Sequence, residues 1–224
     1  MADNSVSLPG NKNVLFTNRQ LVTLMWPLLL EQMLAIAVGL ADSLMVATVG
    51  DAAISAVSLV DSISNLMIYI FSAMATGGAA VAGQYIGLKQ KEDACNAGQQ
   101  LIALLAVVSV SFAALLYLFR PQILTTMFGH IEPDVMDATN TYYLYVMASI
   151  PGIALYNGGA ALFRTMGRSD VSLKVSLLMN GINVTGNAIL IFGVGMDVAG
   201  VAIPTLISRT VAAAVILALL FNKK

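Results

Sequence analysis

The chain has 224 residues, of which 58% are hydrophobic and only 10% are charged, whereas a soluble domain has roughly 45–50% apolar and about 25% charged residues. This composition excludes an ordinary soluble protein. The formal net charge of −1 provides no basic surplus for binding nucleic acid, and one cysteine with one histidine cannot build a disulfide framework or a zinc site.

Six apolar segments follow one another along the chain, each long enough to cross the roughly 30 Å of a bilayer's hydrocarbon core as a helix. The predicted helices are Leu21–Ala47, Ile54–Tyr85, Cys95–Phe119, Ala138–Phe163, Val171–Val194 and Val198–Phe221. The sequence therefore predicts an all-α integral membrane protein with six transmembrane helices. Residues 1–20 are too polar for a cleaved signal peptide and are expected to form a cytoplasmic segment, whereas residues 21–222 form one six-helix unit.

Basic residues predict the orientation of these helices, because the cytoplasmic loops of membrane proteins are enriched in Lys and Arg. Nine basic residues would lie on the side of the chain termini, whereas Arg120 alone would lie on the opposite side. The nine are Lys12, Arg19, Lys89, Lys91, Arg164, Arg168, Lys174, Lys223 and Lys224. Both termini are therefore expected in the cytoplasm.

The segment between the third and fourth helices, Gln122–Asp137, has apolar residues at helical spacing. This pattern predicts a short helix at the membrane interface, with a plain connecting loop as an equal alternative. Aromatic residues near the predicted interfaces are expected to anchor the helices there, as amphipathic rings commonly do. They are Trp26, Tyr142, Tyr143 and Tyr145.

Polar side chains at membrane depth are the candidate functional groups, because the short loops leave no room for a soluble catalytic domain and no enzymatic activity is expected. Asp42 lies about five residues, or roughly 8 Å, below the outer end of the first helix. Asn187 and Thr205 lie at a similar depth on the fifth and sixth helices, and Asn183 lies one turn further in. These oxygen-bearing side chains predict a site for a hard cation or a proton. The alternative is that the asparagines only hold helices together while Asp42 reaches the headgroups.

A second set of polar residues could line a cavity or form a gate: Glu31, Asp61, Asn180 and Arg209. We expect Glu31 and Arg209 to form an ion pair with each other, because pairing lowers the free-energy cost of burying both charges. A gate or proton relay is the alternative for that pair. Asp61 is expected to face a wet outer cavity or a solvated helix end, and Asn180 is interpreted as an interhelical contact.

Four segments, in this order and spacing, carry a family resemblance: PLLLEQMLAIAVGLADSLMVATVGDAAISAVSLVDSI (Pro27–Ile63), ATGGAAVAGQYIGLKQKEDA (Ala75–Ala94), FRTMGRSDVSLKVSLLMNGINVTGNAILIFGVG (Phe163–Gly195) and GVAIPTLISR (Gly200–Arg209). They resemble the N-terminal half of the multidrug and toxic compound extrusion (MATE) transporters. The resemblance runs from about Phe16 to the end of the chain.

The resemblance implies a twelve-helix architecture of two six-helix lobes, of which this chain matches one. It further implies a secondary antiporter that exports organic, often cationic, compounds by alternating access, driven by inward movement of Na⁺ or H⁺. In the family, an acidic residue on the first helix acts with polar residues on the fifth and sixth. The matching positions are Asp42, Asn183, Asn187 and Thr205, and many relatives have aspartate where this chain has Asn187.

The expected partners are a small organic substrate, membrane lipid and a second six-helix lobe, either another copy of the chain or a separate one. We expect no cofactor other than the coupling ion, and a location in a bacterial cell membrane. Two alternatives are a lipid-linked oligosaccharide flippase of the same superfamily, which would call for a more cationic cavity, and a transport-inactive membrane scaffold or fragment. An integral membrane enzyme is a more distant one.

Overall fold

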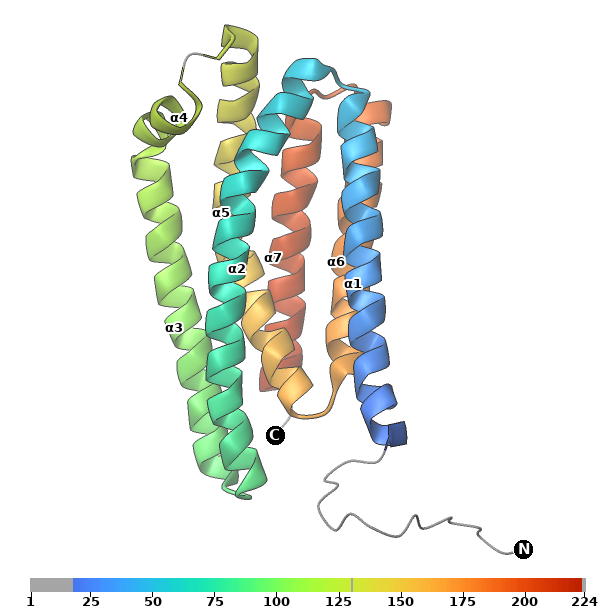
Figure 1. The fold of residues 1–224 in the computed structure, drawn as a ribbon, viewed down its shortest axis with the longest axis vertical. Helices are drawn as coiled ribbons and strands as arrows, with labels where there is room; N and C mark the ends of the chain where they lie inside the picture. Colours follow the sequence, from blue (N-terminus) through green and yellow to red (C-terminus); the bar gives the residue numbers. More distant parts are fainter. Residues whose placement is uncertain (1–17, 130, 223–224) are drawn as a thin grey trace, which may run out of the picture.

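The computed structural model describes residues 18–129 and 131–222, and the described chain is almost entirely helical (Figure 1). Its helices are α1 (Asn18–Ala47), α2 (Asp51–Gly87), α3 (Lys91–Leu118), α4 (Arg120–Phe128), α5 (Pro133–Thr165), α6 (Ser169–Ala188), a π-helical turn (Ile189–Gly193) and α7 (Ala199–Phe221). Six helices among the described residues are long and apolar enough to cross a membrane. The predicted fold class is thereby confirmed.

Several helices begin before the predicted positions, within the polar segments that flank the hydrocarbon-spanning runs. The third spanning helix starts at Lys91, and Glu92 and Asp93 occupy its first turn, where acidic side chains interact favourably with the helix dipole. The fourth starts with Pro133, a residue favoured in the first turn of a helix. The apolar runs of the sequence end at these charges, whereas the helices continue beyond them.

The interfacial helix predicted within Gln122–Asp137 is shorter than that range and starts earlier. Helix α4 covers Arg120–Phe128 and lies beside one end of the bundle (Figure 1). It ends where Gly129 adopts a positive φ of 61°, a conformation that favours glycine. The residues from Pro133 onward belong to α5 instead.

Helix α5 is the centre of the bundle and has buried residues from Thr139 to Phe163. It packs against α2, α3 and α7, whereas α6 packs between α1 and α7. Tyr142 and Tyr143, with exposed fractions of 4% and 0%, lie in this core, and the Tyr143 hydroxyl donates to the carbonyl oxygen of Leu116 at 2.9 Å. The expectation that these two tyrosines are interfacial anchors is therefore wrong.

The beginning of α1 and the end of α7 lie at the same end of the bundle (Figure 1). The α2–α3 and α5–α6 turns, which carry Lys89 and Arg168, lie at that end too. That this end faces the cytoplasm stays a prediction. The predicted N-terminal segment lies outside the described residues except for its last positions, and Lys12, Lys223 and Lys224 lie outside them as well.

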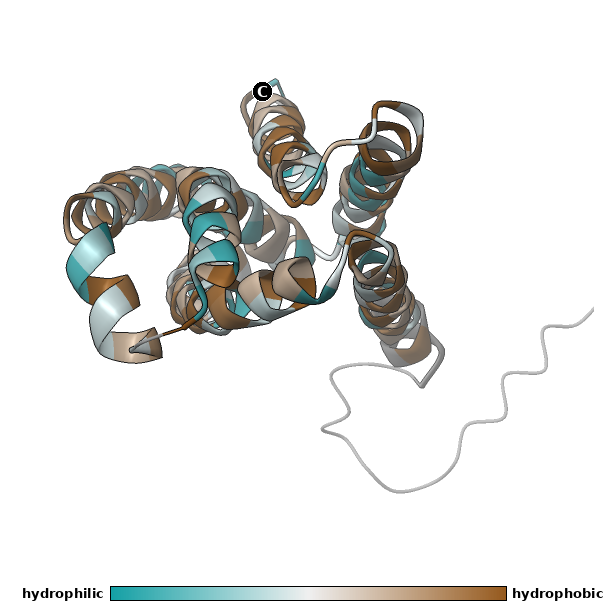
Figure 2. Cartoon of the chain, turned by 90° about the horizontal axis from the view of Figure 1, so that it is seen from above, coloured by the Kyte–Doolittle hydropathy of each residue, from teal (hydrophilic) through white to brown (hydrophobic). Residues whose placement is uncertain are grey.

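Helix α1 stands at the edge of the bundle, and hydrophobic residues occur along every spanning helix (Figure 2). Its exposed stripe consists of Met33, Ile36, Leu40 and Leu44, whose side chains are 64–72% exposed. Such a surface is stable in contact with lipid or with another apolar protein surface. The opposite side of α1 faces α6 and carries the polar residues described next.

Candidate functional site

Helices α6 and α7 approach each other closely at the level of the predicted site because Gly186 has no side chain. A Cβ atom added at Gly186 would lie 2.7 Å from the Cβ of Pro204. Thr205 follows Pro204 on α7, and Asn183 and Asn187 flank Gly186 on α6. The close packing leaves 3.1 Å between the Asn183 amide and the Thr205 hydroxyl oxygen.

We expect Gly186→Ala to destabilise the protein by about 1–3 kcal/mol, the usual effect of overpacking a tight contact. The added methyl group would push α6 away from Pro204. Gly181→Ala is the matched control, because a Cβ at Gly181 of the same helix meets nothing within 4 Å. Thermal unfolding of the two purified variants tests the expectation, and equal melting temperatures would show that the α6–α7 contact is not tight.

Asp42 and Asn187 connect α1 to α6. The Asn187 Nδ2 donates to Asp42 Oδ1 at 2.8 Å. Asn187 is fully buried at 0% exposure, whereas Asp42 is half-buried. The carboxylate of Asp42 therefore lies at the edge of the bundle's interior and is in contact with α6.

The Asn183 amide lies between Asp42 and Thr205 and can face them in two orientations. In the orientation that satisfies donors and acceptors at both ends, Asn183 Nδ2 donates to Asp42 Oδ2 at 3.0 Å and to Oδ1 at 3.2 Å. The Thr205 hydroxyl then donates to Asn183 Oδ1 at 3.1 Å. The structure thus brings together Asp42, Asn183, Asn187 and Thr205, which we call the Asp42 cluster.

One atom of the Asp42 cluster has no hydrogen-bond partner among the described residues: the Oδ1 of Asn187. A buried amide oxygen without a partner is unusual, since nearly all buried polar groups are paired. It carries no proton and can only accept a hydrogen bond or coordinate a cation. The cluster therefore has a free acceptor on the same amide that donates to its one carboxylate.

Asp61 is tied to the central helix rather than pointing only into an outer cavity. It is half-buried on α2 and accepts a hydrogen bond of 3.2 Å from the hydroxyl of Tyr142 on α5. Tyr142 is 4% exposed. The sequence pattern predicts Tyr142 as an anchor and does not reveal it as a partner of Asp61.

The predicted ion pair between Glu31 and Arg209 is wrong. Arg209 Nη1 donates to the hydroxyl oxygens of Ser149 on α5 at 2.8 Å and of Ser64 on α2 at 3.5 Å. Glu31 instead pairs with Arg164, whose Nη1 lies 3.7 Å from Glu31 Oε2. Glu31 and Arg209 both reach α5, but Glu31 bonds to Tyr156 and Arg209 bonds to Ser149, seven residues earlier on that helix.

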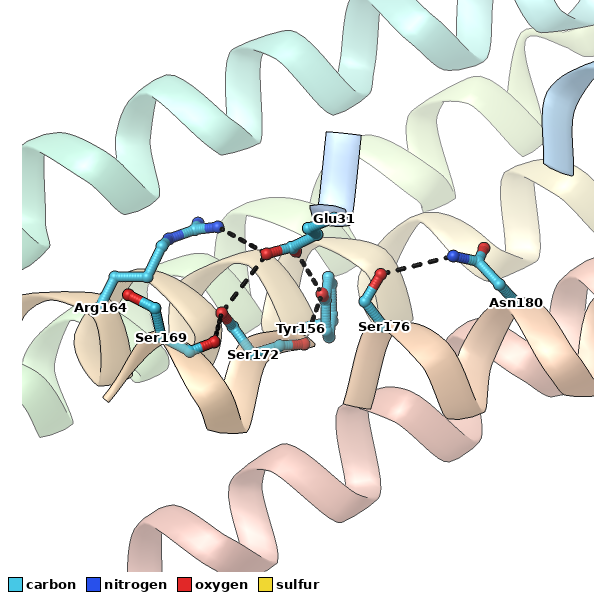
Figure 3. Close-up of polar contacts among 7 residues, drawn as sticks. All are labelled: Glu31, Tyr156, Arg164, Ser169, Ser172, Ser176 and Asn180. Atoms are coloured by element: carbon cyan, nitrogen blue, oxygen red, sulfur yellow. Dashed lines mark hydrogen bonds and ion pairs between the residues drawn. The ribbon is translucent and has the colours of Figure 1, made fainter. Parts of the chain in front are cut away.

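Glu31 anchors a polar network between α1, α5 and α6 (Figure 3). The hydroxyl of Tyr156 donates to Glu31 Oε1 at 2.9 Å, and that of Ser172 lies 3.4 Å from Oε2. Glu31 is buried at 8% exposure, and the Arg164 side chain keeps 30% of its surface exposed. This network, Glu31 with Tyr156, Arg164 and Ser172, is named the Glu31 cluster.

Asn180 does not bond to a neighbouring helix in the hydrogen bonds of the described residues. Its Nδ2 donates to Ser176 Oγ at 3.4 Å, one turn earlier on α6 (Figure 3). The interpretation as an interhelical contact is therefore not supported. Asn157 on α5 was missed, although it is a polar residue in a charge-free span, and its buried Nδ2 has no partner among the described residues.

A family model described as MatE matches residues 27–189. An uncharacterized transporter, YisQ, of Bacillus subtilis (strain 168) is 31% identical over 196 residues, which are 85% of this chain and 42% of the relative. The probable multidrug resistance protein NorM of Thermotoga maritima is 22% identical over 92% of this chain and 45% of its own length. The chain thus spans less than half the length of these curated relatives.

Solved structures of transporters contain the same fold as this chain. An outward-facing multidrug resistance MATE family transporter of the MOP superfamily superposes with a TM-score of 0.86 at 22% identity, over 92% of this chain and 45% of that one. A MOP superfamily transporter from Pyrococcus furiosus superposes with a TM-score of 0.85 over the same shares of the two chains, also at 22% identity. Six apolar helices and bacterial relatives make the chain a multi-pass protein of the bacterial cell membrane.

Proposed function

The chain belongs to the MatE family of membrane transporters, and we propose that it acts as one lobe of a Na⁺-driven antiporter that exports small organic, often cationic, compounds. The named relatives include a probable multidrug resistance protein and a multidrug export protein. Coverage of about 45% of a solved MATE transporter fits one of two lobes. The second lobe would be another copy of this chain or a separate six-helix unit.

The observation that carries the proposal is the Asp42 cluster with its unpartnered Asn187 oxygen. The cluster offers one carboxylate, two amide oxygens and one hydroxyl, all from residues that are at least half-buried. Hard cations such as Na⁺ prefer oxygen ligands of these kinds. A cation beside Asp42 would give the Asn187 Oδ1 the partner that it lacks.

The orientation of the Asn183 amide would respond to that cation. With no cation or proton present, the amide nitrogen faces the carboxylate and donates to both of its oxygens. The reverse orientation points the Asn183 oxygen at Asp42, which is favourable only when a positive charge or a proton lies between the two acceptors. Cation binding would therefore exchange hydrogen bonds of Asp42 for ion ligands.

Na⁺ rather than H⁺ is proposed because the Asp42 cluster has a single ionisable group. A proton relay between two carboxylates would need a second acidic residue beside Asp42, and the side chain that bonds to Asp42 is the amide of Asn187. Asp61, the other acid of this region, bonds to Tyr142 on a different helix. Neutral oxygens around one carboxylate are better suited to coordinating a cation than to passing a proton onward.

Alternating access would follow from the position of the cluster between α1 and the α6–α7 pair. Asp42 links the edge helix α1 to α6 through Asn187, and its bonding changes when an ion binds. Such a change shifts the balance between two arrangements of α1, which is how an ion gradient can drive a transporter through its cycle. The export direction requires that ion binding and substrate binding favour different arrangements.

The function can be tested by reconstituting the purified protein, together with its second lobe, into liposomes that contain a fluorescent organic cation. An imposed Na⁺ gradient at equal pH should drive the dye against its own gradient, and a Na⁺ ionophore should abolish this transport. Transport that responds to a pH gradient and not to Na⁺ would replace Na⁺ by H⁺ in the proposal. No response to either gradient would contradict an ion-coupled exporter.

A further inference from the structure

A positively charged side chain lies near the middle of the bundle, outside both clusters already described. Arg209 is the tenth residue after Ala199, the start of α7, which places it about 15 Å along the helix. Its Nη1 lies 2.8 Å from Ser149 Oγ and 3.5 Å from Ser64 Oγ. We refer to Arg209, Ser64 and Ser149 as the Arg209 cluster.

The charge of Arg209 has no counter-ion within contact distance in the described part of the chain. The ion pairs found there are those of Arg164 with Glu31 and of Lys174 with Asp170. A guanidinium has five N–H donors, and the hydrogen bonds above use one nitrogen and two neutral hydroxyls. A charge at membrane depth is costly without a partner, so the remaining donors are suited to an anionic group.

The guanidinium is held in place rather than free to move. Ser149 is fully buried and donates its own proton to the carbonyl oxygen of Val146 at 2.6 Å, so its oxygen can accept from Arg209. Helix α7 also packs tightly on α5 at this level, because a Cβ at Gly152 would lie 3.1 Å from the carbonyl carbon of Arg209. Fixed donors bind a carboxylate with less loss of side-chain entropy than mobile ones.

Negative charges lie nearby but do not touch the guanidinium. Asp61 is three residues before Ser64 on α2 and therefore shares its helix face. The carboxylates of Asp61 and Asp42 are close enough to interact electrostatically with Arg209, although neither forms an ion pair with it. They would repel a simple anion and attract an amine, so the site presents charges of both signs side by side.

We propose that the Arg209 cluster binds the carboxylate of a zwitterionic organic substrate, with the substrate's amine directed toward Asp61. Arg209 then acts as a specificity residue that lets this lobe accept molecules with a free acid group, in addition to simple cations. The inference rests on the proposed transport function, because it assigns a subsite within the same lobe. It is tested by equilibrium binding, which needs neither an ion gradient nor transport.

Two probes are compared. The first is a rhodamine dye with a free carboxylate, which is a zwitterion, and the second is the methyl ester of the same dye, which is a cation. Fluorescence polarisation measures the affinity of the purified protein, with its second lobe present, for each dye. The free acid should bind the unmodified protein more tightly than the ester does. Arg209→Gln should weaken binding of the acid by about tenfold to a hundredfold, the usual loss for hydrogen bonds to a charged group, and leave the ester unchanged.

Arg209→Lys is the matched variant, because it keeps the charge but loses the planar fork that matches a carboxylate. It should give an intermediate ratio of the two affinities. Equal binding of acid and ester by the unmodified protein would overturn the proposal without any variant. Weaker binding of both dyes by the same factor in Arg209→Gln would overturn it as well. If the protein fails either binding test but still carries out Na⁺-driven transport, the proposed transport function stands.

Discussion

Replacing Asp42 by asparagine should reduce Na⁺-driven transport to the level of liposomes without protein. The substitution removes the carboxylate of the Asp42 cluster and leaves neutral ligands, which bind a desolvated cation far more weakly. The fold should persist, because an amide oxygen at the same place can still accept the hydrogen bond that Asn187 Nδ2 donates at 2.8 Å. We therefore expect normal amounts of folded protein with no coupling.

The control for this variant is Asp197→Asn, which changes the same kind of side chain in the exposed turn before α7. It should leave Na⁺-driven transport unchanged, because Asp197 lies outside the Asp42 cluster. Both variants are measured in the same liposome assay, with melting temperatures recorded to compare their folding. Full transport by Asp42→Asn would mean that the coupling ion binds elsewhere.

Replacing Glu31 by leucine should destabilise the protein by about 1–3 kcal/mol, the usual range when a buried polar group loses its partner. The hydroxyl of Tyr156, a residue that is 4% exposed, would lose its 2.9 Å bond to Glu31. Arg164 would lose its ion-pair partner as well, although its 30% exposed side chain can turn toward water. Helix α1 would lose these two bonds to α5.

Two further variants separate the contributions. Glu31→Gln keeps an oxygen for Tyr156 and should lose less than the leucine variant. Asp170→Asn removes the partner of Lys174 in an exposed pair with side chains 75% and 52% accessible, and such pairs contribute roughly 0–1 kcal/mol. Urea denaturation in detergent measures all three, and a leucine variant no less stable than Asp170→Asn would contradict a structural role for the Glu31 cluster.

The spanning helices could be predicted from the sequence because membrane thickness sets the length of each apolar run and charges mark the ends of these runs. The same reasoning placed Asp42, Asn187 and Thr205 at one depth, since distance along a helix is a simple count of residues. The structure brings these three and Asn183 together. What the residue count could not provide was the close approach of α6 and α7 at Gly186, which closes the gap between them.

The predicted ion pair between Glu31 and Arg209 is wrong because the depth of a residue in the membrane does not determine its partner. Glu31 lies sixteen residues before the end of α1 at Ala47, or roughly 24 Å from it, whereas Arg209 lies about 15 Å from the start of α7. Their depths therefore differ. Both side chains contact α5, but Glu31 also bonds to α6 and Arg209 also bonds to α2. The partners depend on which helices are neighbours, and that order comes from tertiary packing and not from the hydropathy pattern.

Tyr142 illustrates a second limit. A tyrosine near a predicted interface can face lipid as an anchor or face the core as a hydrogen-bond donor, and both positions suit its apolar ring and polar tip. The choice depends on rotation of α5, which is buried on nearly all sides and has no clear polar face. The sequence pattern therefore could not assign Tyr142 to Asp61.

The most direct test of the Asp42 cluster as a Na⁺ site is equilibrium binding of radiolabelled Na⁺ to the purified protein and to its Asp42→Asn variant at the same pH. We expect a single class of saturable Na⁺ sites in the unmodified protein and the loss of these sites in the variant. Equal Na⁺ binding by the two proteins, or no saturable binding by either, would contradict the assignment of the Asp42 cluster as the Na⁺ site.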